Sequence, residues 1–119
     1  MLIAQAPNAR GVVKLRVSGT LRANDYEREL PKLDRWHGEH EQLRYYVELD
    51  PDFAGFEARA LFKELRFDWQ HRGDVGRSVL VGDGRGQDWA ARFAELLFAG
   101  EVRHFPRDEA EQAWEWVNG

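Results

Sequence analysis

Four residues whose side chains could perform acid–base or metal chemistry stand at the ends of predicted elements. Asp50 and Asp52 follow an alternating strand, Asp83 follows an apolar strand, and His71 lies near the end of a predicted helix. Ligand clefts in α/β proteins form at the carboxyl ends of parallel strands. The carboxylates could therefore bind a hard cation or form an acid/base pair, and His71 could transfer a proton. Helix caps, turns and a charge at a helix C-terminus are the structural alternatives for these residues.

A glycine-rich run at 82–86, GDGRG, follows a predicted strand and opens a predicted helix. Its amides could bind a phosphate at the positive end of the helix, with Arg85 adding charge. The run fits neither the G-x-G-x-x-G fingerprint nor the P-loop, which requires Lys followed by Ser or Thr. A flexible turn, with Asp83 or Asp88 near the helix start, is the alternative interpretation.

An aromatic cluster between 53 and 69 is the strongest indication of binding. Phe53 and Phe56 lie in a predicted loop, and Phe67 lies off the main apolar stripe of the predicted helix at 57–72. Such a cluster is most often part of the core. This one has more aromatic side chains than one sheet-facing helix can bury, and an exposed apolar patch of this size indicates a ligand or a partner. The predicted binding residues are Phe53, Phe56, Phe62, Phe67, Trp69, His71, Asp83 and Arg85.

These residues are positioned by alternating strands and helices. Alternation and apolar runs predict strands at 2–6, 12–18, 43–50, 78–82 and 101–105. Helical spacing predicts helices at 24–40, 57–72, 87–98 and from about 108 to 117. We expect the first two strands to form a hairpin and the later strands to be parallel, joined by right-handed crossovers.

Charged residues on the strands predict how the helices are distributed. Lys14, Arg16 and Glu48 all fall on the face away from the apolar stripes. Burying them unpaired beneath helices would be costly. We therefore expect helices mainly on one face of the sheet, with Arg16 and Glu48 paired across strands on the other.

Composition limits the class of protein. A chain of 119 residues fits a single domain, 1–119, and a net charge of −4 gives no electrostatic footprint for nucleic acid. The absence of cysteine excludes disulfides and cysteine-ligated metal. No apolar stretch is long enough to span a bilayer and no basic leader is present. We expect a cytoplasmic protein without a cofactor.

Short matches along almost the whole chain resemble the SpoIIAA-like family of the STAS superfamily. The matching residues are LRVSGTL at 15–21, DYE at 25–27, LP at 30–31, FD at 67–68, HR at 71–72, VGD at 81–83, Trp89, GEVR at 100–103, Phe105 and AW at 113–114. The resemblance implies an α/β fold of the βα-superhelix type, with a mixed five-stranded sheet whose N-terminal strand is antiparallel and with helices mainly on one face. It also implies a shape similar to that of CRAL-TRIO lipid-binding domains, and a small bacterial protein without established enzymatic activity that binds hydrophobic ligands or membranes.

The chain departs from STAS antagonists at the regulatory loop. Those proteins carry a phosphorylatable Ser or Thr after the central strand, whereas residues 50–57 here read DPDFAGFE. Switching by phosphorylation of a hydroxyl is therefore excluded at that site. Gly84 and Gly86 stand where bulkier residues are expected, which makes that loop more flexible than in relatives.

Two classes of function follow from the sequence. The favoured one is a non-enzymatic binding module in which the helix at 57–72 covers an apolar pocket and moves aside for a hydrophobic ligand or lipid, a membrane surface, or a protein partner, which could be a second copy. Gly55, Gly73 and Gly76 are its candidate hinges. The alternative is a small hydrolase or metal-dependent enzyme that uses Asp50, Asp52, Asp83 and His71. An enzyme should bring at least two of these four side chains within hydrogen-bond reach of each other.

Overall fold

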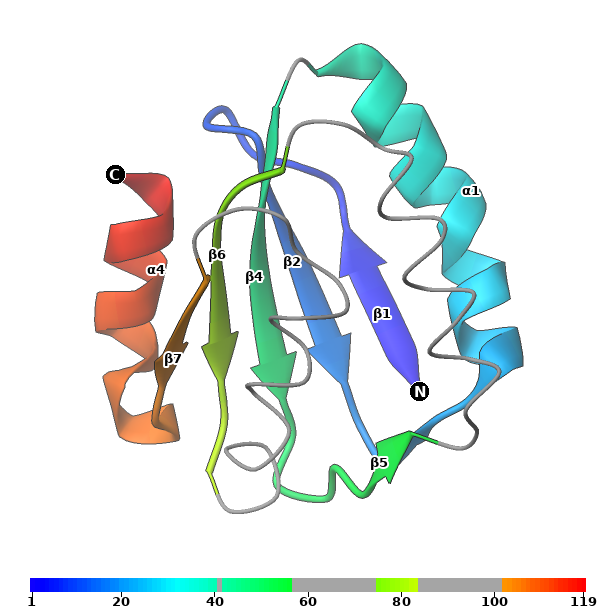
Figure 1. The fold of residues 1–119 in the computed structure, drawn as a ribbon, viewed down its shortest axis with the longest axis vertical. Coiled ribbons are helices and arrows are strands. Elements are labelled where there is room, and N and C mark those ends of the chain that lie inside the picture. The colour runs from blue at the N-terminus through cyan, green and yellow to red at the C-terminus, as the bar shows by residue number, and fades with distance from the viewer. Residues whose placement is uncertain (41, 57–74, 84–101) are drawn as a thin grey trace.

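A five-stranded mixed sheet forms the centre of the molecule (Figure 1). The computed structural model describes residues 1–40, 42–56, 75–83 and 102–119. The strands follow the order β1-β2-β4-β6-β7, with β1 antiparallel to β2 and all other neighbours parallel. Their bounds are β1 Leu2–Gln5, β2 Val12–Val17, β4 Leu43–Leu49, β6 Val75–Val81 and β7 Val102–Phe105. The predicted α/β fold with a mixed five-stranded sheet is confirmed.

The turn between β1 and β2 is fixed by Asn8 and Gly11. The Asn8 side-chain oxygen accepts hydrogen bonds from the backbone amides of Arg10 at 2.9 Å and Val12 at 3.1 Å. Gly11 has a φ of 75°, and a Cβ atom added there would lie 3.1 Å from the backbone oxygen of Gln42. Glycine is favoured here because this backbone conformation is costly for other residues. The predicted hairpin is confirmed.

Helices α1 and α4 lie at opposite sides of the sheet (Figure 1). Helix α1, Ala23–Glu39, runs beside β1, while α4, Ala110–Asn118, follows a short 3₁₀ turn, η1 Arg107–Glu109, and packs on β4 and β6. At the start of α1, the Asp25 carboxylate accepts the backbone N–H of Arg22 at 3.2 Å. The predicted helices at 57–72 and 87–98 lie outside the described residues.

The two faces of the sheet differ in character. The side chains of Val13, Leu15, Val17, Tyr45, Val47, Leu49 and Leu80 share one face and are buried. We call it the α1 face, because His37 of α1 forms a hydrogen bond with Tyr45 there. The other, the α4 face, has an apolar cluster formed by Val12, Tyr46, Val79 and Val81 with Ala113 and Val117 of α4.

The charged residues lie on the α4 face, as their alternation predicts. Helices were expected mainly on one face, which leaves room for α4 to pack on the β4 and β6 portion of the α4 face. Arg16 remains exposed, and Lys14 and Glu48 are half-buried. Arg16 stands opposite Glu48 in the sheet, but its Nε donates to Asp50 Oδ1 at 2.8 Å. This bond, together with the charge of Asp50, raises the pKa of the Arg16 guanidinium.

A second, two-stranded ladder was not predicted. Strand β3, Thr20–Leu21, pairs in parallel with β5, Gly55–Phe56, and the Ala54 amide donates to the Gly19 carbonyl at 2.7 Å. Strand β6 also begins at Val75, three residues before the predicted strand at 78–82, and an irregularity in its pairing with β4 lies between Val75 and Ser78. The ladder ties the end of β2 to the loop that follows β4.

Candidate functional site

The three strand-end carboxylates each bind a different structural partner. Asp50 accepts a hydrogen bond from Arg16, and Asp52 accepts the Gly19 amide at 3.2 Å. Asp83 accepts the Arg107 amide at 3.0 Å. Within the described residues there is no group of three or more His, Cys, Asp or Glu side chains that could hold a metal ion. Turn and loop contacts therefore account for all three carboxylates.

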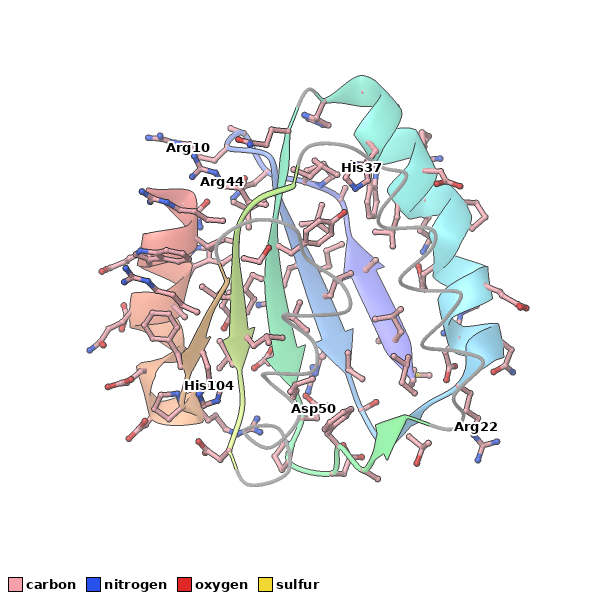
Figure 2. The ribbon with its side chains drawn as sticks, viewed as in Figure 1. Arg10, Arg22, His37, Arg44, Asp50 and His104 are labelled. Carbon is pink, nitrogen blue, oxygen red and sulfur yellow. The ribbon has the colours of Figure 1, made fainter. Side chains whose placement is uncertain are left out.

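Two further side chains at this edge also bind backbone. Figure 2 places Asp50 and His104 at the same edge of the sheet. His104 Nε2 lies 2.8 Å from the Gly82 carbonyl oxygen, and Arg107 Nη2 donates to the Leu49 carbonyl at 2.7 Å. Both contacts connect the segment around η1 to the ends of β4 and β6. The carboxyl edge is thus closed by structural hydrogen bonds in the part of the chain that the structure describes.

The predicted aromatic site is placed only in part. Phe53 is buried, with 3% of its surface exposed, and belongs to the core. Asp83 is exposed, and the backbone of Phe56 lies in β5. The side chain of Phe56 and the remaining predicted binding residues lie outside the described part: Phe62, Phe67, Trp69, His71 and Arg85.

Three polar side chains from three elements lie on the otherwise apolar α1 face. We call them the Tyr45 cluster: His37 of α1, Tyr45 of β4 and Ser78 of β6. His37 Nε2 lies 2.6 Å from the Tyr45 hydroxyl, and Figure 2 shows His37 pointing from α1 toward the sheet. Tyr45 and Ser78 are register partners in adjacent parallel strands, so their side chains share a face. Tyr45 and Ser78 are both fully buried.

Ser78 is the unusual member of the cluster. Its hydroxyl is inaccessible to solvent and has no hydrogen-bond partner among the residues that the structure describes. A buried polar group without a partner costs about 1–3 kcal/mol of stability. Native proteins contain few such groups, and one that persists calls for a functional or solvent partner.

The sequence reasoning missed this cluster. Ser78 opens an apolar strand and was interpreted only as its first residue, and Tyr45 lies on the apolar side of an alternating strand. His37 shares a helical stripe with Leu33 and Trp36, both of which are buried. The available signal was that a serine and a tyrosine fall on the buried face of two strands, together with a histidine on the buried side of a helix.

Burial determines the protonation of His37. Loss of solvation lowers the pKa of its imidazole below the ordinary value. The ring is therefore neutral at physiological pH, and in this form one ring nitrogen carries a proton and the other is a hydrogen-bond acceptor. A neutral imidazole against a tyrosine hydroxyl can form a hydrogen bond in either direction.

This lowered pKa predicts how stability depends on pH. As pH falls below about 6.5, the unfolded chain takes up a proton at His37 before the folded protein does. The contribution of this group to stability is therefore complete above pH 6.5 and is lost as pH falls toward the lowered folded pKa. The His37→Gln variant cannot take up that proton. We therefore expect its melting temperature to fall less than that of the wild type when the pH is lowered from 7.5 to 5.5. Equal losses in the two proteins, measured by circular dichroism, would contradict the assignment.

Comparison with known proteins places the chain in a family. The SpoIIAA-like family model matches residues 12–118. Among solved structures, the chain is similar to an uncharacterised protein of the DUF3478 family with a SpoIIAA-like fold from Shewanella loihica PV-4. The two share 20% sequence identity with a TM-score of 0.69, over 98% of this chain and 92% of that one. No curated protein matches the chain. With a mixed sheet of the expected order and a family match over nearly its whole length, the chain belongs to the SpoIIAA-like family.

Proposed function

We propose that this protein is a non-enzymatic binding module for a hydrophobic small molecule or lipid that carries one polar group. The observation that supports the proposal is the Tyr45 cluster, in which the Ser78 hydroxyl is buried on an apolar sheet face and has no partner in the described part of the chain. Ligand sites are lined mostly by apolar side chains, with a few polar groups that fix orientation. The α1 face has this composition.

The chemistry of the cluster defines the class of ligand. A serine hydroxyl and a tyrosine hydroxyl each donate and accept hydrogen bonds, and neutral His37 adds no charge. The matching polar group is a hydroxyl, a carbonyl or a protonated carboxyl at the end of an apolar chain. A permanently charged head group fits poorly, because the cluster provides no counter-ion and burying a charge unpaired is costly.

Ligand entry requires a conformational change, because Tyr45 and Ser78 are fully buried. The predicted gate at 57–72 lies outside the described residues, and its movement remains part of this proposal. One described hinge candidate fits it: Gly55, immediately before the gate, has a φ of 114°. A backbone conformation that favours glycine at this point is consistent with a hinge.

The enzymatic alternative is less well supported. Asp50, Asp52 and Asp83 bind a guanidinium and two separate backbone amides. A shared proton or a shared metal ion would require at least two of them to face one site. Among the described residues, the carboxylates instead hold loops in place.

Native mass spectrometry of protein taken directly from cells tests the proposal. We expect a fraction of the protein to carry an additional mass of a few hundred daltons, which is removed by extraction with organic solvent or a hydrophobic resin. The stripped protein should then bind oleic acid from a series of small molecules that includes a polar control such as succinate. The proposal would be rejected if protein from cells carried no additional mass and the stripped protein bound no apolar probe.

A further inference from the structure

Part of the α4 face is left open beside α4. Three large hydrophobic side chains in the described residues are more than a third exposed: Met1 at 55%, Ile3 at 46% and Trp114 at 37%. Ile3 is the register partner of Arg16 and so points to the α4 face, and Met1 precedes it by two residues along the same edge. Trp114 lies on the flank of α4, edge-on to Tyr46 at 5.3 Å between ring centroids. All three side chains therefore belong to one surface.

This surface, which we call the open strip, runs over β1 and β2 between Ile3 and Trp114. The width of the open strip is the distance from β1 to β4, which is two inter-strand spacings or about 10 Å. An α-helix with its side chains has a similar diameter, about 10–12 Å. The open strip can thus accept a single helix lying beside α4.

The open strip carries an available positive charge. Lys14 Nζ lies 5.4 Å from the ring centroid of Tyr46 and 6.0 Å from that of Trp114. It has no carboxylate partner among the described residues, whereas the neighbouring Arg16 is bound to Asp50. An occupant that brings a carboxylate would pair with Lys14.

The molecule itself presents the complementary surface. Glu111 and Glu115 lie on the exposed side of α4, and Glu111 is three residues before Trp114. Residues three and four apart on a helix are neighbours, so Glu111 borders both Trp114 and Glu115. Neither glutamate forms an ion pair in the described part of the chain. An acidic helix edge with an apolar tryptophan therefore lies beside a cationic apolar strip.

We infer that two copies of this chain associate face to face, with α4 of each copy lying on the open strip of the other. A two-fold axis satisfies both contacts at once, because each copy supplies one helix and one strip. Trp114 then packs on the partner's open strip, and Glu111 and Glu115 approach Lys14 of the partner subunit. This inference is independent of ligand binding at the α1 face.

The edge of the sheet favours this arrangement over strand pairing. An unpaired β1 edge could add a strand from another chain. However, α1 lies along β1, and Arg28 Nη2 donates to the Leu2 carbonyl at 3.1 Å. The face is therefore the more accessible surface. A strip of one helix width buries a small area, so the dimer should be weak, in the range of interfaces below about 1,200 Å².

Sedimentation velocity of the full chain over a wide concentration range tests the inference. The wild type should show a concentration-dependent equilibrium between monomer and dimer. Lys14→Glu alone, and Glu111→Lys combined with Glu115→Lys, should each raise the dissociation constant by about tenfold or more, because like charges then face each other. The matched control is Arg35→Glu, at an exposed position of α1, which should leave the dissociation constant unchanged.

Mixing the two charge-reversed variants gives the sharpest result. In the mixed dimer both contacts pair opposite charges again, so association should return to the wild-type level, and native mass spectrometry should show the heterodimer in excess over either homodimer. A wild type that stays monomeric at all concentrations would overturn the inference. So would a dimer that is insensitive to both variants, or a mixture that fails to restore association.

Discussion

Tyr45→Ala should lower the free energy of unfolding by about 3–5 kcal/mol, on the scale of other buried aromatic-to-alanine changes. Among the described residues, Tyr45 is the largest fully buried side chain, and it lies on β4, the central strand of the sheet. Removing its ring leaves a cavity between β4 and α1 and leaves His37 without its hydroxyl partner. Since small domains have a total stability of about 5–15 kcal/mol, the variant should be close to unfolding in urea.

The matched control is Tyr45→Phe, which keeps the ring and removes only the hydroxyl. We expect a loss of about 0.5–1.5 kcal/mol, the net contribution of one hydrogen bond. Urea denaturation of both variants separates packing from hydrogen bonding. If the phenylalanine variant were as unstable as the alanine variant, the hydrogen bond rather than the ring would be the main contribution.

Ser78→Ala should act in the opposite direction and stabilise the ligand-free protein by about 1 kcal/mol or more. The hydroxyl is buried and bonds to none of the described residues, so its removal should relieve a desolvation cost without breaking a hydrogen bond. The small volume change leaves little cavity. Ser18→Ala is the control at the only other serine of the chain, and its effect should be near zero. A Ser78→Ala protein that is less stable than the wild type would show that the hydroxyl has a structural partner such as a bound water.

The sheet was the most predictable part of the structure. Val12–Val17 and Leu43–Leu49 alternate regularly, and a register slip of one residue would put their charged side chains on the apolar face. The pattern therefore fixed both the strands and the face that each side chain occupies. The hairpin followed because Gly11 and Asn8 mark the turn.

Features that depend on contacts between distant segments were not predictable. The β3–β5 ladder involves two residues on each side, too few to produce a periodic signal. Helix α4 packs on the α4 face although Lys14 lies there. Lys14 is half-buried, and its charged end lies over the rings of Tyr46 and Trp114. A lysine can cover apolar surface with its stem, so charge alone did not exclude a helix there.

The candidate site shows the same limit. Phe53 is predicted to bind because it lies in a predicted loop, and the structure shows only that it is buried. The Tyr45 cluster escaped prediction because its members come from three elements, and no spacing in the sequence joins them. Sequence periodicity indicates which face a residue occupies. It does not identify which polar groups meet on that face.

Titration of ligand-stripped protein with the fluorescent fatty acid cis-parinaric acid tests whether a ligand binds at the Tyr45 cluster. We expect saturable binding by the wild type and by Ser18→Ala, and an affinity lower by about tenfold for Ser78→Ala, the loss expected for one hydrogen bond in a buried site. Ser78→Ala should show this weaker binding although its ligand-free form is the more stable one. Equal affinity in all three proteins, or no saturable binding by the wild type, would contradict a ligand site at the Tyr45 cluster.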